Sequence, residues 1–117
     1  MSAATTSIRV FGAYLVVLGA ALVVAPNAVL APFGVPPTSE VWVRVVGVLA
    51  VALGFYYTVA ARFGLVPFYR ATVVARAFVF VCFGAFVLLG WAAPALALFG
   101  AVDLAGAVWT ATALRKG

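Results

Sequence analysis

The stretch that decides the fold is Ile8–Ala25, IRVFGAYLVVLGAALVVA, in which Arg9 is the only charged residue and which Pro26 follows directly. A helix needs about 20 predominantly apolar residues to cross the hydrocarbon core of a bilayer. Working outward, three further stretches of this kind span about 41–61, 69–90 and 94–114. The sequence therefore predicts an all-α fold, a bundle of four transmembrane helices that alternate in direction, as one domain over residues 1–117.

The composition supports lipid as the surrounding solvent. Hydrophobic residues make up 68% of the 117-residue chain and charged residues 8%. A soluble domain of ordinary composition carries about 25% charged residues, which cover its core with polar surface. The Pro-rich segment between the first two spans is predicted to hold a short interfacial turn of helix over about 27–33, too short to cross.

The positive residues predict the orientation. Three regions must share one side of the membrane, namely the start of the chain, the loop after the second span and the end of the chain, and they carry Arg9, Arg62, Arg70, Arg115 and Lys116. The other side has only Arg44, offset by Glu40. Positive residues favour the cytoplasmic side. We therefore expect cytoplasmic termini in a multi-pass protein of the bacterial inner membrane, with Trp42 and Trp91 at the outer interface and Tyr69 at the inner one.

The net charge of +5 does not indicate nucleic-acid binding, because the basic residues form no cluster or stripe. The chain has no histidine, and its one cysteine, Cys82, lies within an apolar run. These absences exclude a bis-histidine haem, a Cys-x-x-Cys redox pair and a Ser-His-Asp relay within the chain. We expect no cofactor and no metal ion.

Glycines recur at a spacing that favours helix packing. The pairs Gly12 and Gly19, and Gly47 and Gly54, are each seven residues apart, about two helical turns, so each pair lies on one face. Faces of small residues let helices approach closely in lipid. Two further glycines, Gly100 and Gly106, lie in the last span. The alternative is a substrate path between thin helices.

The first two spans share a sequence pattern. Arg9-Val10-Phe11-Gly12 and Arg44-Val45-Val46-Gly47 stand 35 residues apart, and the offset also aligns Gly19 with Gly54. Because the two spans run in opposite directions, a duplication would be an inverted repeat. The alternative is a chance match in a chain dominated by a few apolar residue types.

Asp103 lies near the middle of the last span, where a charge costs about 2.5–3.5 kcal/mol on insertion scales. Its side chain is too short to reach the interface, so we expect it to point into the bundle. Arg76 in the third span is the best partner, and Arg44 is the alternative from the outer side. Thr72, Tyr56 and Tyr57 complete the candidate polar site. The pair has two possible roles, a structural lock or a gated site.

Several stretches resemble a group of small bacterial four-helix membrane proteins, namely Ala25-Pro26-Asn27, PPTSEVWVR over residues 36–44, GFYY over 54–57 and FGAVDLAGAVWT over 99–110. In architecture this group is similar to the DoxX-like superfamily, some members of which serve quinone- or thiol-linked redox systems. The resemblance implies a four-helix membrane fold. No cofactor residue of that superfamily can be matched, and the lack of histidine argues against a redox role.

Three functions fit these features. The first is a non-enzymatic bundle that acts as an accessory subunit or as a homo-oligomer, with membrane lipid and another membrane subunit or further copies as partners. The second is a small transporter or channel that uses the Asp103–Arg76 pair, which requires a polar cavity reaching Asp103. The third is a component of a lipid- or quinone-linked membrane enzyme, which requires a cleft open sideways to the bilayer, expected near Tyr56 and Tyr57.

Overall fold

The structure is a computed structural model, and it describes residues 2–116. This part of the chain contains helices and no strands; in order, the helices are α1 (Ala3–Val24), α2 (Pro26–Leu30), the 3₁₀-helix η1 (Ala31–Phe33), α3 (Val41–Phe63), α4 (Val66–Leu88) and α5 (Ala95–Arg115). The helices α1, α3, α4 and α5 are long and apolar enough to span a membrane. The prediction of four long apolar helices is therefore confirmed.

The helix ends differ from the sequence-based bounds by several residues, for local reasons. Helix α1 begins at Ala3 because the Ser2 hydroxyl accepts a hydrogen bond from the Thr5 amide at 3.1 Å, which caps the helix. Helix α3 ends at Phe63 because the next residue, Gly64, has a left-handed φ of 62°, a conformation that favours glycine. The chain turns there and enters α4 at Val66, so the connection is shorter than the predicted loop.

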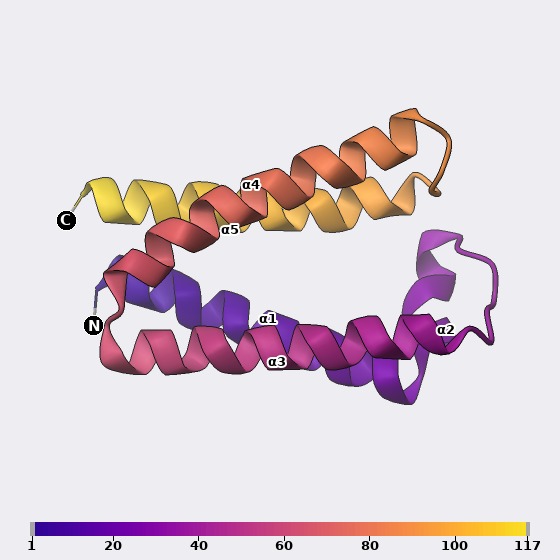
Figure 1. Cartoon of the computed structure of the whole chain (residues 1–117), viewed down its shortest axis with the longest axis horizontal. Coiled ribbons are helices and arrows are strands. Elements are labelled where there is room, and N and C mark those ends of the chain that lie inside the picture. Colours follow the sequence, from indigo (N-terminus) through magenta and orange to yellow (C-terminus); the bar gives the residue numbers. More distant parts are fainter. Residues whose placement is uncertain (1, 117) are drawn as a thin grey trace.

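The four long helices form two pairs, which Figure 1 shows as two layers. Helix α1 packs along α3, α4 packs along α5, and the main contact between the pairs is that of α1 with α5. Successive long helices alternate in direction, and both ends of the described chain lie at the same end of the bundle (Figure 1). The short segment α2–η1 lies at the opposite end.

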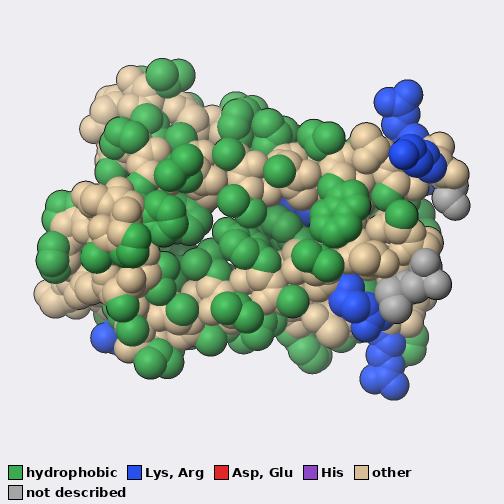
Figure 2. Space-filling view, turned by 180° about the vertical axis from the view of Figure 1, so that it is seen from behind, with side chains coloured by type: hydrophobic (Ala, Val, Ile, Leu, Met, Phe, Trp, Pro, Cys, Tyr) green, Lys and Arg blue, Asp and Glu red, His purple; other side chains and the backbone are tan. Residues whose placement is uncertain are grey.

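The outer surface is apolar, and the interior holds polar side chains beside apolar ones such as Ile8 and Phe11. Leu88, Trp91 and Trp42 are among the most exposed side chains, whereas Ser7, Thr110 and Arg76 are buried. Figure 2 shows hydrophobic side chains over the middle of the molecule and most of the basic ones near its ends. This is the reverse of a soluble domain and fits a surrounding of lipid.

Tyr69, which is expected at the inner interface, lies near the end of the bundle that holds the chain ends, with its side chain turned inward. The side chain is 1% exposed, its hydroxyl lies 2.8 Å from Oγ1 of Thr5, and it donates to the carbonyl oxygen of Ala60 at 3.4 Å. Tyr69 therefore joins the start of α1, the end of α3 and the start of α4. The sequence position alone placed it at a helix end without saying which face of the helix it occupies.

Helices α1 and α3 cross so closely that their glycines are in backbone contact. A Cβ atom on Gly47 would lie 2.6 Å from the carbonyl oxygen of Gly19, and one on Gly54 would lie 2.7 Å from that of Gly12. Real Cβ atoms do not approach other atoms so closely, so these positions require glycine. Adding 35 to Gly12 and Gly19 gives Gly47 and Gly54, so each glycine of α1 contacts the counterpart of the other one. The crossing therefore has a local two-fold pattern.

Candidate functional site

The centre of the candidate site is Arg76, which projects from α4 into the bundle and is 3% exposed. Its Nε donates to the carbonyl oxygen of Thr72 at 3.2 Å. Its Nη2 donates to Oγ1 of Thr72 at 3.0 Å and to Oγ1 of Thr110 at 2.9 Å. The guanidinium group therefore connects α4 to α5 through two threonine hydroxyls.

A network of hydroxyl groups continues from the guanidinium group to α1. Oγ1 of Thr110 lies 2.7 Å from the hydroxyl oxygen of Ser7, and Ser7 also donates to the carbonyl oxygen of Ala4 at 2.7 Å. Thr72 donates to the carbonyl oxygen of Tyr69 at 2.8 Å. These groups satisfy one another, so the bundle has a hydrogen-bonded polar layer between Arg76 and the end where the chain ends lie.

Two aromatic rings cover the guanidinium group. The Cζ atom of Arg76 lies 4.7 Å from the ring centroid of Phe11 and 5.7 Å from that of Tyr57. The face of an aromatic ring attracts a cation, and the attraction is stronger where water is excluded. Phe11 and Tyr57 are both buried. The rings compensate part of the charge of Arg76 without accepting a conventional hydrogen bond.

One nitrogen atom of Arg76, with its two N–H groups, is left without a partner among residues 2–116. Nη1 is buried and has no hydrogen-bond partner within residues 2–116. It lies against Gly106 of α5, where a Cβ atom would come within 2.8 Å of Nη1 and 2.9 Å of the Phe11 ring. Gly106 therefore makes room for the guanidinium group and Phe11 together. A buried unpartnered donor is costly and calls for an explanation.

The expected ion pair between Asp103 and Arg76 is not present in the described part of the chain; the donors of Arg76 go to Thr72 and Thr110 instead. Long side chains in a helix point back toward its N-terminus, and Arg76 follows this rule by bonding to Thr72 one turn earlier. That direction leads away from Asp103, because Thr110 lies about 10 Å further along α5. Gly106, against which Arg76 Nη1 lies, follows Asp103 by three residues, so Asp103 is about one helical turn from the guanidinium group.

The remaining candidate residues divide between the site and the surface. Tyr57 and Thr72 contact Arg76 or its ring partners, whereas Tyr56 is 57% exposed and faces outward. Arg44 donates to the carbonyl oxygen of Val23 at the end of α1, and so contributes to neither Asp103 nor Arg76. Gly100 packs more loosely than the other candidate packing glycines, since a Cβ atom there would lie 3.3 Å from Phe83.

The site also includes residues that the sequence did not single out. Ser7, Phe11 and Tyr14 come from α1 at spacings of four and three residues, which place them on one helix face. Thr110 lies seven residues after Asp103, on the same face of α5. These spacings are the sequence signal that could have identified the residues. A polar or aromatic stripe on an otherwise aliphatic helix marks the face that points into the bundle.

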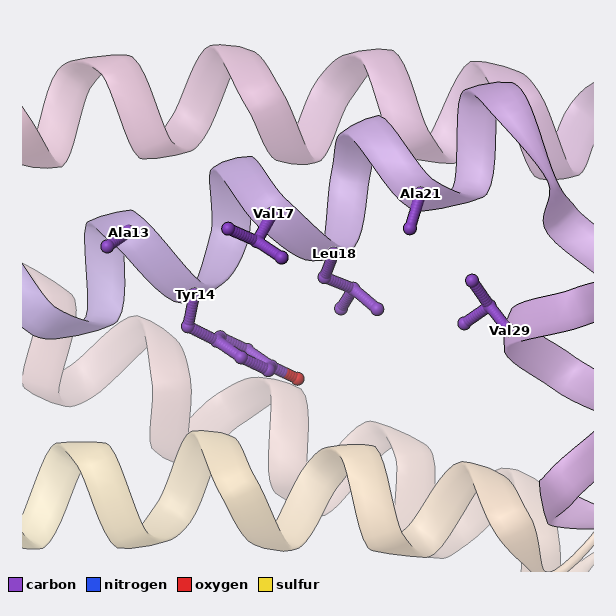
Figure 3. Close-up of a pocket in the computed structure, with 6 residues that line it drawn as sticks. All are labelled: Ala13, Tyr14, Val17, Leu18, Ala21 and Val29. Carbon is purple, nitrogen blue, oxygen red and sulfur yellow. The ribbon is translucent and has the colours of Figure 1, made fainter.

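An apolar groove runs along α1 beside this cluster. One part has a volume of about 480 Å³, and Figure 3 shows its lining residues, which are Ala13, Tyr14, Val17, Leu18, Ala21 and Val29. A second part of about 230 Å³ continues it toward α5 and shares three of these residues; it is lined by Tyr14, Leu18, Val29, Phe33, Leu98, Phe99 and Val102. Figure 2 shows the surface hollowed between the two layers.

Tyr14 links the groove to the polar cluster. Figure 3 shows its ring projecting from α1 toward α5, with the hydroxyl oxygen at the tip. Its ring centroid lies 5.4 Å from that of Phe11, which covers Arg76. On the facing helix, Val102 lines the groove and Asp103 follows it. The Tyr14 ring therefore lies between the groove, which it lines, and the Phe11 ring that covers the buried guanidinium group.

The fold and this site define the chain as a multi-pass membrane protein with an intramembrane polar cluster beside an apolar groove. Comparison of the chain with models of protein families, with curated proteins and with solved structures finds no match. The resemblance to the DoxX-like superfamily therefore gains no support from them.

Proposed function

We propose that this membrane protein binds a molecule dissolved in the lipid phase, which enters sideways into the groove between α1, α2 and α5. The observation that carries the proposal is an almost entirely apolar groove into which the one polar side chain of its lining, Tyr14, projects. The volume of the larger part, about 480 Å³, falls within the range of small-molecule sites, about 300–1,000 Å³. A cleft of this kind suits an amphiphile with an apolar tail.

Of the three functions predicted from the sequence, this proposal is nearest to the lipid- or quinone-linked enzyme. It keeps the binding of a lipid and leaves out the catalysis. Catalysis requires a positioned nucleophile or acid–base pair, and Asp103 shares no hydrogen bond with Arg76 or the tyrosines in the part of the chain described. The cleft lies at Tyr14 on α1 rather than at Tyr56 on α3. The groove is apolar except for the Tyr14 hydroxyl group, which favours binding of an apolar molecule over the passage of a polar solute.

The role as an accessory subunit or homo-oligomer stays a prediction. The exposed apolar side chains cover all four long helices, including Val17 on α1, Leu53 on α3, Val74 on α4 and Val108 on α5. Lipid alone requires such a surface, so it selects no face for a partner. A lipid-binding protein and a partner subunit are compatible, because the groove occupies one side of the bundle.

Ala21→Phe is expected to lower the amount of lipid retained by the purified protein several-fold, because the added ring fills the groove. Ala20→Phe is the matched control, since Ala20 is the neighbouring residue on α1, is exposed and does not line the groove. Native mass spectrometry of both variants, purified from their own membranes, measures the lipid-bound fraction. Equal retention by both variants would contradict the proposal.

We also propose that both chain ends face the cytoplasm of a bacterium, across its inner membrane, with the connection before α3 outside. The support is the excess of positive residues near the ends and near Arg62. In a Cys82→Ala background, Ser39→Cys should react with a membrane-impermeant maleimide on intact cells. Ser2→Cys and Lys116→Cys should react only after permeabilisation. The opposite labelling pattern would reverse the orientation.

A further inference from the structure

The end of the bundle that holds the chain ends carries most of the positive charge of the protein. Helices α1 and α4 begin there, and α3 and α5 end there (Figure 1). Five of the seven basic residues lie at this end and form what we call the basic collar, which consists of Arg9, Arg62, Arg70, Arg115 and Lys116. We propose that the basic collar binds the phosphate groups of anionic phospholipids in the leaflet around it. This site is separate from the groove.

The first support is that the protein does not neutralise these charges. The acidic residues of the sequence are Glu40, which precedes α3 at the opposite end of the bundle, and Asp103, which lies within α5. All five side chains of the basic collar are exposed. The arginine side chains that donate hydrogen bonds within residues 2–116 are Arg44 and Arg76, and neither belongs to the collar. The collar therefore needs negative charge from outside the chain.

The second support is the placement of the charges on the flanks of the bundle. Arg9 lies six residues after the start of α1, about 9 Å along the helix, and Arg70 lies four residues after the start of α4, about 6 Å along it. Long basic side chains on a lipid-facing flank extend to the head-group layer. Figure 2 shows basic side chains at this end on both layers. Lipid surrounds all flanks at once, whereas an acidic protein would meet one face or the tip.

The third support is the chemistry of the side chains. Four of the five collar residues are arginines, and the planar guanidinium group binds a phosphate group through two parallel N–H donors. The Cζ atom of Arg62 lies 5.7 Å from the ring centroid of Phe63, and this ring is exposed. An aromatic ring beside a basic group suits the boundary between acyl chains and head groups. A phospholipid supplies both the acyl chain for the ring and the phosphate for the guanidinium group.

The opposite end of the bundle lacks such a collar. Arg44 is the one basic residue of the sequence there, and its guanidinium group donates to the carbonyl oxygen of Val23 at the end of α1. Glu40 adds a negative charge at the same end, so the side-chain charges there sum to zero. Anionic lipid should therefore collect in one leaflet, at the end that holds the chain ends, and Arg44 provides an internal control.

The test uses two phospholipids with the same palmitoyl and oleoyl chains, anionic phosphatidylglycerol and zwitterionic phosphatidylcholine. Purified protein in detergent is mixed with equal amounts of both, and native mass spectrometry measures the ratio of the bound lipids. Phosphatidylglycerol should be favoured at least about fivefold, the ratio that one basic residue near a membrane surface supplies. Arg9→Gln, Arg62→Gln and Arg70→Gln should each lower this ratio, and the triple variant should bring it close to one. Arg44→Gln should leave it unchanged.

Two results would overturn the proposal. The first is equal binding of the two lipids by the unchanged protein. The second is a preference for phosphatidylglycerol that the triple variant keeps or that Arg44→Gln lowers as strongly. The substituted collar side chains are exposed, so the variants should fold, which circular dichroism checks. Ala21→Phe should leave the lipid ratio unchanged, because it fills the groove and not the collar, so failure of the groove proposal is a separate outcome.

Discussion

Gly47→Val is expected to prevent stable packing of α1 on α3. A Cβ atom on Gly47 would lie 2.6 Å from the carbonyl oxygen of Gly19 and 2.9 Å from Val23. The first neighbour is backbone, which cannot move aside as a side chain can. Overpacking of a well-packed contact costs about 1–3 kcal/mol, and the remaining atoms of valine add to this contact, so we expect the upper end of the range or more.

The measurement is thermal unfolding in detergent, followed by circular dichroism, with Gly84→Val as the control. Gly84 lies within α4, and a Cβ atom there meets nothing within 4 Å. Both variants exchange a helical glycine for valine, so the difference between them isolates the crossing of α1 and α3. Similar unfolding temperatures for the two variants would show that the close glycine contact is not required.

Arg76→Leu is the second variant with a large expected effect. The substitution removes the hydrogen bonds to Thr72 and Thr110, and it removes the cation that lies against Gly106, one turn after Asp103. A lone aspartate near the middle of a membrane costs about 2.5–3.5 kcal/mol on insertion scales. We expect Arg76→Leu to lower the free energy of unfolding by an amount of this size. Asp103→Asn in the same chain should restore part of it.

The two single variants and the double variant form a thermodynamic cycle, measured by the same unfolding experiment. Arg70→Leu is the control, because Arg70 lies on the same helix but is exposed at its end. Coupling between Arg76 and Asp103 appears as a double-variant loss smaller than the sum of the single losses. Additive losses would mean that the two charges are energetically independent.

The sequence predicted the elements well, because the signal for a membrane-spanning helix is long and depends on composition alone. The regular spacing of Gly12, Gly19, Gly47 and Gly54 also indicated which faces are small. It did not show which glycine meets which, since that depends on how two helices cross. The pairing of Gly12 with Gly54 follows from the antiparallel direction of α1 and α3.

The polar site was harder to predict because a sequence gives depth along a helix but not the direction of a side chain. The positions of Arg76 and Asp103 along their helices placed them at similar depths in the membrane, which favoured a contact between them. Arg76 instead points back toward Thr72. As a result, neither Nη1 nor the Asp103 carboxylate has a hydrogen-bond partner among residues 2–116. The groove was not visible in the sequence, because Ala13, Leu18 and Val29 are ordinary residues whose spacing from α5 depends on tertiary packing.

The pairing of the long helices into two layers has a mechanical consequence. The glycine crossing makes α1 and α3 one stiff unit, while the seam between the layers rests chiefly on α1 and α5. Stiff units joined along a narrow seam move by rocking against each other, a hinge or shear motion of microseconds to milliseconds. Such rocking would widen or narrow the opening of the groove without breaking the glycine contacts. A ligand could then bind and dissociate while α1 and α3 stay packed together.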